Sequence, residues 1–332
     1  MRNYYIFKSG RISRKDNSII FEYKENEKQN KIPIPVNDID NIYCFGEIDF
    51  NTKLINFLSE NKIIVHFFNY YGFYTGTFYP KEFLNSGELI IKQVEHYLDN
   101  TKRIFLAREF VLGAYNGIVK NIKRYIEEKP ELKSILDKIE FIGRELKNAN
   151  EVQELMGLEG NIRENYYKSF NIIINQNIDF SKRVFHPPDN MINTLISFLN
   201  TLVYTTVLSE IYKTQLNPTI SYLHAPGTRR FSLALDIAEI FKPIFADRII
   251  FRILNKNEIT ENDFEKDLNY IYLKDKGRKK IVALFDERMK KTIYHKSLKK
   301  KVSYRALIRL ECYKLIKHLI GEVPYKSFNI WW

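Results

Sequence analysis

One histidine and two carboxylates stand close together in residues 222–239 and could hold a metal ion. A Pro-Gly pair follows His224, and apolar residues then recur at helical spacing, which predicts a turn and then a helix with Asp236 and Glu239 on one face. Mixed carboxylate and imidazole ligands suit Mg²⁺ or Mn²⁺ better than a structural zinc ion. The alternative is a solvated helix face next to an ordinary turn histidine.

A third carboxylate, Glu159, lies between two glycines whose small size would let an ion or a phosphate backbone come close. Arg163 follows one helical turn later. At this spacing it is either an i,i+4 ion-pair partner of Glu159, as on many helices, or a phosphate contact beside the metal. Carboxylate and imidazole ligands for an ion of this kind indicate phosphate chemistry.

The sequence around these residues predicts two domains, one rich in strands and one helical. The first 85 or so residues contain short aromatic or β-branched runs bounded by Gly, Asn, Asp and Pro, and we expect a strand-rich domain over 1–85 with one helix at about Thr52–Glu60. Residues 86–332 are predicted to form an α-helical catalytic domain, so the fold class is α+β. Its helices are expected to begin near Leu89, Glu131, Gly160, Pro188, Ser232, Glu261, Gly277 and Ser303.

The net charge of +12 has an uneven distribution. Residues 271–332 carry 17 Lys+Arg and 5 Asp+Glu, which gives +12, and residues 1–270 sum to zero. Apolar residues separate the basic clusters, so we expect a folded basic surface that binds a polyanion, with Lys299, Lys300 and Lys301 among the contacts. A solvated lysine-rich face is the alternative.

Cysteine usage and hydropathy exclude several classes of protein. Cys44 and Cys312 are far apart and form no Cys-x-x-Cys pair, which argues against a disulfide framework or a cysteine zinc cluster. Polar residues interrupt the apolar stretch 191–208, so a buried core helix is expected there and no membrane span. Without a signal-peptide pattern at its start, the chain is expected to be cytoplasmic.

Several motifs together resemble one family. Gly-Leu-Glu159-Gly-x-x-Arg163 is followed by Tyr166, by Arg183-x-x-x-Pro-Pro-Asp-x-x-x-Asn193, and by the segment from His224 to Glu239. In order and spacing these resemble the CRISPR-associated protein one family of CRISPR adaptation integrases. Residues 45–54 and 66–80 extend the similarity over nearly the whole chain.

The resemblance implies a ligand set for one divalent ion, Mg²⁺ or Mn²⁺, consisting of Glu159, His224 and Glu239. It implies that Asp236 is a nearby supporting carboxylate of the catalytic site. Arg163, Arg183 and Lys242 are candidate DNA contacts. Lys242 departs from the family, which often has arginine there, so a point charge replaces a bidentate fork.

The family also implies partners. Its members form homodimers through the β-rich domain, here with the aromatic run from Phe67 to Tyr74, which we expect to fill a core and a dimer interface more than to stack bases. The dimers flank a small partner, CRISPR-associated protein two, and hold double-stranded or branched DNA.

The sequence is therefore interpreted as a metal-dependent DNA integrase and endonuclease that inserts new spacers into a CRISPR array by phosphoryl transfer. Two alternatives stay open. One is a transposon-type integrase of the same superfamily, and the other is a non-catalytic nucleic-acid-binding module.

Overall fold

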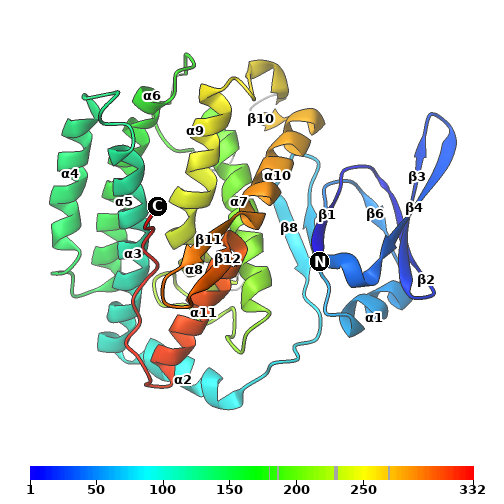
Figure 1. The fold of residues 1–332 in the computed structure, drawn as a ribbon, viewed down its shortest axis with the longest axis horizontal. Coiled ribbons are helices and arrows are strands. Elements are labelled where there is room, and N and C mark those ends of the chain that lie inside the picture. Colours follow the sequence, from blue (N-terminus) through cyan, green and yellow to red (C-terminus); the bar gives the residue numbers. More distant parts are fainter. Residues whose placement is uncertain (179, 185–186, 228–230, 268–269) are drawn as a thin grey trace. The chain divides into compact units, whose positions relative to one another are not determined.

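A computed structural model describes the chain except residues 179, 185–186, 228–230 and 268–269. The chain divides into two compact units (Figure 1). Unit 1 comprises Met1–Phe83 and Tyr272–Val282, and unit 2 comprises Leu84–Ile271 and Ala283–Trp332. The segment 272–282 therefore returns from the later half of the sequence to join the first 83 residues.

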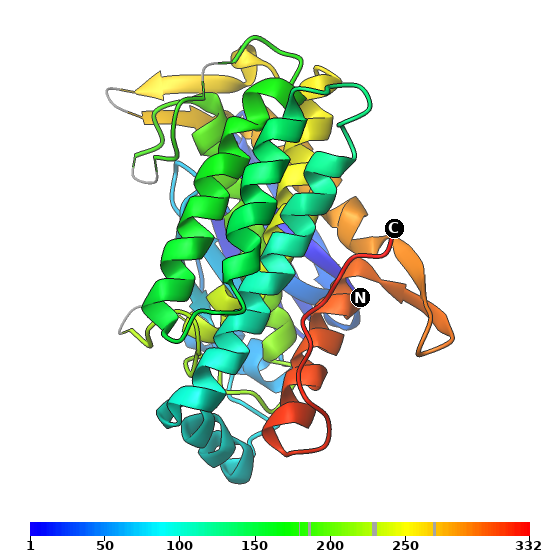
Figure 2. The ribbon, with the colours of Figure 1, turned by 90° about the vertical axis from the view of Figure 1, so that its left-hand side faces the viewer.

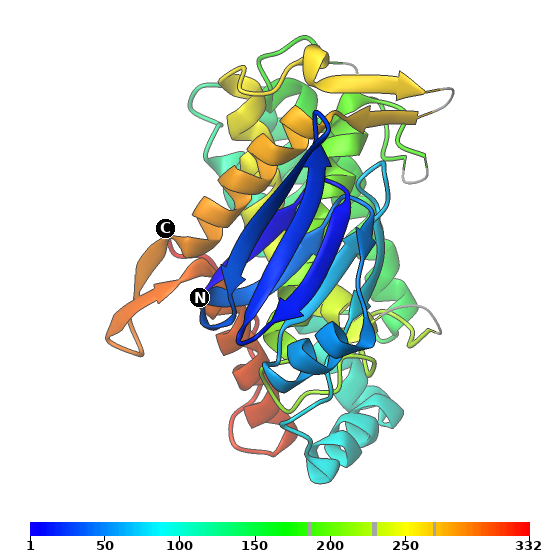
Figure 3. The same cartoon turned by 90° about the vertical axis from the view of Figure 1, so that its right-hand side faces the viewer.

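Unit 1 contains two four-stranded sheets, with orders β1-β5-β7-β8 and β4-β3-β2-β6, visible as the blue and cyan strands of Figure 3. In the first sheet β1, β5 and β7 are parallel and β8 is antiparallel. The strands are β1 (Arg2–Ile6), β2 (Gly10–Lys15), β3 (Ser18–Glu25), β4 (Lys28–Pro35), β5 (Ile39–Cys44), β6 (Ile48–Asp49), β7 (Ile64–Phe68) and β8 (Tyr74–Phe78).

Helix α1 (Thr52–Glu60) forms as the sequence predicts, because the Asn51 side chain accepts a hydrogen bond from the Leu54 N–H at its start. Its buried Leu54, Phe57 and Leu58 join the isoleucine-rich core between the strands. A short 3₁₀ turn, η1 (Val36–Asp38), links β4 to β5. In the predicted aromatic run, Phe68 is buried, whereas Tyr70 is 67% exposed.

Unit 2 is mainly helical, and its long helices pack side by side (Figure 2). Helix α8 packs against both α3 and α7. The helices are α2 (Gly87–Leu98), α3 (Asn100–Lys123), α4 (Leu132–Glu145), α5 (Val152–Lys168), α6 (Phe170–Ile173), α7 (Met191–Ile211), α8 (Ser232–Lys242), η2 (Pro243–Asp247), α9 (Arg248–Asn255), η3 (Glu261–Asp263), α10 (Asp275–Lys290), which spans both units, and α11 (Tyr304–Leu319).

Helix α7 is long and apolar enough to cross a membrane, but 78% of its apolar window is buried inside the protein. It is the core helix that the interrupted apolar stretch predicts. Next to it, α8 continues through the π-helical turn η2 into α9, so one winding column carries Glu239 and Asp247.

Two ribbons of two strands each follow, and the second of them is antiparallel. They are β9 (Phe264–Asp267) with β10 (Tyr270–Leu273), and β11 (Thr292–His295) with β12 (Lys300–Ser303). Strand β10 ends in the segment assigned to unit 1. The α+β fold class is confirmed, but the helix expected from Glu261 is wrong: the chain makes one 3₁₀ turn there and then enters β9.

Candidate functional site

Asp236 fixes the position of His224. Its fully buried carboxylate accepts hydrogen bonds from the backbone N–H groups of Tyr222, Leu223 and His224 at 2.7, 3.0 and 3.0 Å, and it lies 2.8 Å from Nδ1 of the His224 ring. With Nδ1 bound to the carboxylate, Nε2 is the ring nitrogen that can bind a ligand. Asp236 is therefore a positioning residue whose oxygens are engaged within the protein.

The loop that carries His224 is also held from α2 and α3. The amide of Gln93, which is fully buried, donates to the Asn217 carbonyl at 3.2 Å and accepts from the Asn217 N–H at 2.8 Å. Arg103 Nε donates to the carbonyl of Tyr222 at 3.1 Å. Neither Gln93 nor Arg103 belongs to a recognisable motif, so sequence reasoning did not find them.

Glu159 and Glu239 meet at one guanidinium. Arg163 on α5 forms ion pairs with Glu159, one turn earlier, and with Glu239 on α8, and Lys242 forms a further ion pair with Glu239. The side chains of Arg163 and Lys242 are each 15% exposed and that of Glu239 is 9% exposed, so the cluster is nearly buried. The expected ion pair of Arg163 with Glu159 is present, and contact of Arg163 with a phosphate stays a prediction.

The charges in this cluster alter its proton affinities. Burial alone would raise the pKa of Glu239, but the positive charges of Arg163 and Lys242 outweigh burial and lower the pKa to about 2. Burial would lower the pKa of His224, but its hydrogen bond to Asp236 and the nearby Glu239 raise it. Glu239 is thus an anion at neutral pH next to an imidazole that holds its proton more tightly than usual.

A second buried acid lies behind the cluster. Burial raises the pKa of Asp247 to about 7, against the opposing influence of Arg163 and of a hydrogen bond with Tyr166. Tyr166 also accepts a hydrogen bond from Asn121 at 2.9 Å. Asp247 therefore changes its charge near neutral pH, and the negative charge of Glu239 is among those that influence it.

Arg183 lies in a different setting from Arg163. Its guanidinium donates to Oδ1 of Asn193 at 2.9 Å and to Oγ of Ser197 at 2.8 Å, which joins the segment before α7 to that helix. Asn193 in turn donates to Asp189 at 2.7 Å. The Arg183 to Asn193 motif is thus a structural clasp, and contact of Arg183 with DNA stays a prediction.

The donor set fits a hard divalent cation in chemistry. Two carboxylates pair with the same guanidinium, and a histidine with Nδ1 on a carboxylate is the usual arrangement of an imidazole ligand. Within the described residues, however, no three His, Cys, Asp or Glu side chains are gathered as a ready-made metal cluster. Arg163 and Lys242 hold the carboxylates instead, so an ion would compete with these two cations for them.

The predicted basic contacts Lys299, Lys300 and Lys301 lie on and beside strand β12, away from the carboxylate cluster in the sequence and on a separate ribbon. All three are exposed. They form part of a surface and not part of the candidate metal site.

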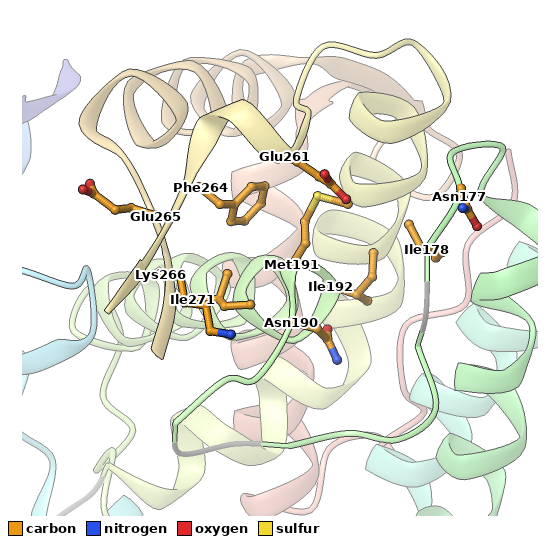
Figure 4. A pocket seen from close by; sticks show the side chains of 10 residues that line it. All are labelled: Asn177, Ile178, Asn190, Met191, Ile192, Glu261, Phe264, Glu265, Lys266 and Ile271. Atoms are coloured by element: carbon orange, nitrogen blue, oxygen red, sulfur yellow. The ribbon is translucent and has the colours of Figure 1, made fainter. Parts of the chain in front are cut away.

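Unit 2 also has a cavity of about 360 Å³ between β9, β10 and the start of α7 (Figure 4). None of the residues of the candidate metal site lines it. Its walls are mostly apolar, with side chains of both charges at the rim, and consist of Asn177, Ile178, Asn190, Met191, Ile192, Glu261, Phe264, Glu265, Lys266 and Ile271.

Comparison with known proteins gives one consistent family. Residues 4–287 match the model of the family described as CRISPR associated protein Cas1. A protein of Fusobacterium nucleatum named CRISPR-associated endonuclease Cas1 is 56% identical over 331 residues, which covers 100% of this chain and 97% of the relative.

Solved structures agree with this match. A CAS1 protein from Thermotoga maritima superimposes with a TM-score of 0.88 at 41% identity and covers 99% of this chain and 100% of that one. A casposase bound to integration product has a TM-score of 0.85 at 21% identity, covering 99% and 93%. A chain of a Cas6-RT-Cas1–Cas2 complex has a TM-score of 0.85 at 18% identity, covering 98% and 36%, and these last two likenesses show the fold alone.

Proposed function

The chain belongs to the CRISPR-associated Cas1 family, and from this premise we propose that it is a DNA endonuclease and integrase that inserts new spacers during CRISPR adaptation. The observation that carries the proposal is that Arg163 joins Glu159 to Glu239, while His224, held by Asp236, lies close enough to Glu239 to influence its pKa. Glu159, Glu239 and His224 are the three residues that the family motifs assign to catalysis.

We propose that Glu159, His224 and Glu239 hold one Mg²⁺ or Mn²⁺ ion. When bound, such an ion stabilises the charge that develops on a phosphodiester during attack by a 3′-hydroxyl or by water. The chain's own residues prepare this site. Asp236 keeps the His224 ring in the orientation that turns Nε2 to the site, and the low pKa of Glu239 keeps that carboxylate charged at neutral pH.

Arg163 and Lys242 act as phosphate contacts in this proposal. In the structure both are paired with Glu239, and a divalent cation on that carboxylate would take over the neutralisation of its charge. The guanidinium and the ammonium then become available for the phosphate oxygens of DNA. The exchange places cations beside the reacting phosphate when the ion is present.

The test separates chemistry from binding. Glu159→Ala, His224→Ala and Glu239→Ala are each expected to abolish nicking and strand transfer on branched DNA with Mn²⁺ or Mg²⁺, while DNA affinity in chelator changes little. Glu164→Ala is the matched control, since Glu164 is an exposed carboxylate on the same helix as Glu159. Wild-type strand transfer by both Glu159→Ala and Glu239→Ala would reject the assigned site.

A transposon-type integrase is the second candidate, and its support is the fold shared with the casposase. The CRISPR assignment is favoured because the 56% identical relative, matched over its length, bears the CRISPR name. A non-catalytic module is disfavoured because the full set of candidate ligands is present. Absence of metal-dependent cleavage would instead favour the non-catalytic module.

We further propose that Lys299, Lys300 and Lys301 bind the DNA backbone. Their replacement by glutamine is expected to weaken binding to all duplex sequences alike and to flatten the dependence of affinity on salt by roughly one unit per lost contact. Equal salt slopes for the variant and the wild type would contradict this role.

The partners we propose are a second copy of the chain, joined through unit 1, and Cas2. The support is the family and the likeness to a chain of a Cas1–Cas2 complex, together with exposed apolar side chains of unit 1 such as Tyr70 and Phe50. Light scattering should give a dimer at micromolar concentration, and Tyr70→Ser with Phe50→Ser should weaken it more than the control Phe83→Ser. A wild-type monomer would contradict the dimer.

We also propose a cytoplasmic location, which follows from spacer insertion as the proposed function.

A further inference from the structure

The ribbon β11–β12 lies in a segment of unusual composition. Residues 288–310 contain nine Lys or Arg and not one Asp or Glu. Some of these cations are neutralised from elsewhere, as Arg305 and Arg309 are by the buried Glu210. The lysines of the ribbon are Lys296, Lys299, Lys300 and Lys301, and none of them makes an ion pair within the part of the chain that the structure describes.

The two faces of the ribbon differ. In the antiparallel register Ile293 lies opposite Val302 and Tyr294 lies opposite Lys301. Neighbouring pairs point to opposite faces. Val302 is buried, so its face is the inner one, whereas Tyr294 is 56% exposed and stands beside Lys301 on the outer face. At the turn between the strands, Leu298 is 41% exposed.

The inner face is supported by the segment 321–332, which we call the strap. The strap runs along unit 2 next to the ribbon (Figure 2). Buried Glu311 accepts hydrogen bonds from the Phe328 N–H at 2.9 Å and the Tyr325 hydroxyl at 2.6 Å, and these bonds fix the strap to α11. Trp331 then meets the ring of His295, with ring centres 5.6 Å apart.

The strap packs against a different face of α8 from the candidate metal site. Phe328 of the strap packs on Phe241, with ring centres 5.5 Å apart. Phe241 is two residues from Glu239, so the two side chains leave the helix on different faces. The outer face of the ribbon is therefore a surface separate from the carboxylate cluster.

From this arrangement we propose that the outer face of the β11–β12 ribbon binds an unpaired strand of DNA, with a base stacked on Tyr294 and the neighbouring phosphates against Lys299 and Lys301. An exposed ring among unneutralised lysines is the combination by which proteins bind single strands, since each unpaired base offers a flat face and each phosphate a charge. Phosphates alone would need only the lysines. The inference deepens the proposed function, because it rests on DNA being the polymer that the protein handles.

The experiment measures the affinity of the full-length chain for a labelled single strand and for the corresponding duplex in chelator, by fluorescence anisotropy. Tyr294→Ala should weaken binding of the single strand by about fivefold to a hundredfold, the range for loss of one stacking side chain, and leave the duplex unchanged. Tyr294→Phe should bind like the wild type. Tyr313→Ala is the matched control, since Tyr313 is an exposed tyrosine of α11.

Charge is tested separately from stacking. Lys301→Gln should reduce the salt slope for the single strand by about 0.7, whereas Tyr294→Ala should leave the slope unchanged. Trp331 and Trp332 are the two tryptophans of the chain, so their emission reports whether the ribbon still sits on the strap in each variant. If Tyr294→Ala alters that emission, the two variants that keep the ring carry the test. Tyr294→Phe should still bind the single strand like the wild type, and Lys301→Gln should still reduce the salt slope.

Equal loss of single-strand and duplex affinity in Tyr294→Ala, or no loss of either, would overturn the stacking site. A reduced affinity in Tyr294→Phe would do the same, since the ring face is retained. Because chelator removes the metal-dependent chemistry from these measurements, failure of the ribbon site is distinct from failure of the proposed catalytic activity, which the Glu159 and Glu239 variants test.

Discussion

The two halves of the candidate catalytic site are built in opposite ways. The half with His224 is locked by backbone hydrogen bonds, because Asp236 accepts three N–H groups of the loop and Gln93 clamps the same loop at Asn217. The other half consists of two carboxylates, Glu159 and Glu239, that charged side chains hold in place. One half is fixed by the fold, and the other is fixed by charge.

The difference shows which half can respond to a ligand. Breaking the hydrogen bonds around Asp236 would leave buried backbone N–H groups without acceptors, which is costly, so this half stays as it is. In the proposed metal site, a divalent cation would replace the ion pairs of Arg163 and Lys242 without leaving Glu239 uncompensated. The rigid half therefore presents the imidazole, and the charged half adapts.

The largest expected effect comes from breaking the rigid half. Asp236→Ala should lower strand transfer by about 100-fold, the upper range for a residue that orients a metal ligand. It should also reduce the free energy of unfolding by about 3 kcal/mol or more, since three N–H groups lose their acceptor. Asp236→Asn, which keeps an acceptor, should lose less of both in activity assays and urea unfolding. Wild-type activity in the alanine variant would show that His224 needs no such support.

The charged half should respond to metal when its cation is removed. Arg163→Gln is expected to lower the free energy of unfolding in chelator by roughly 3 kcal/mol, because Glu159 and Glu239 are left close together without their shared partner. Mn²⁺ should then raise the melting temperature of the variant more than that of the wild type. Lys168→Gln on the surface of the same helix is the control. An equal metal-induced shift in variant and wild type would mean that Arg163 and the ion do not compete.

A smaller effect is expected at the outer clamp of the rigid half. Gln93→Ala should reduce the rate of strand transfer by about tenfold, the lower range for a positioning contact, because Asn217 and the loop before His224 lose two hydrogen bonds. Affinity for DNA should be unchanged, since Gln93 is fully buried. A fall in affinity with an unchanged rate would place Gln93 in DNA binding and not in positioning.

The smallest effect concerns the pH dependence of stability. The pKa of Asp247 is raised from 3.8 to about 7 by burial, so the folded state binds a proton that the unfolded state has lost, and stability should fall as pH rises from about 4 to about 7. The raised pKa of His224 acts in the same direction at the upper end of this window. Asp247→Asn should flatten the slope by at most about 1.4 kcal/mol per pH unit in urea unfolding. A variant slope as steep as that of the wild type would assign the dependence to other groups.

The sequence predicted the fold class, and the helix that carries Asp236 and Glu239, better than it predicted the contacts of these side chains. Spacing indicated that Asp236 and Glu239 belong to one helix, and the structure places both on α8. Spacing also placed both carboxylates on one face, but Asp236 binds the loop that carries His224 whereas Glu239 binds Arg163 of α5. Residues three apart on a helix differ in direction by about 60°, which is enough for two different neighbours. The bridge from Arg163 to Glu239 joins residues 76 positions apart, and only the fold brings them together.

Two helix starts that the local sequence predicted, at Glu261 and at Gly160, differ from those in the structure. Thr260 and Asp263 form a complete capping box, the usual start of a helix, yet the helix ends after one 3₁₀ turn because the chain then pairs as a β-ribbon from Phe264. Helix α5 begins at Val152, eight residues before the predicted start at Gly160, so Glu159 lies inside a helix whose two glycines face open space.

The π-helical turn Pro243–Asp247 determines in which direction the side chains of Asp247 and of the following helix α9 leave the helix axis. Eight residues separate Glu239 from Asp247, which in an unbroken α-helix at 3.6 residues per turn would rotate the second side chain about 80° away from the first. The wider turn absorbs part of that rotation, and the positive charge of Arg163 influences the pKa of both acids. Removing one residue from this turn would rewind it towards an ordinary helix and rotate Asp247 and α9 relative to Glu239.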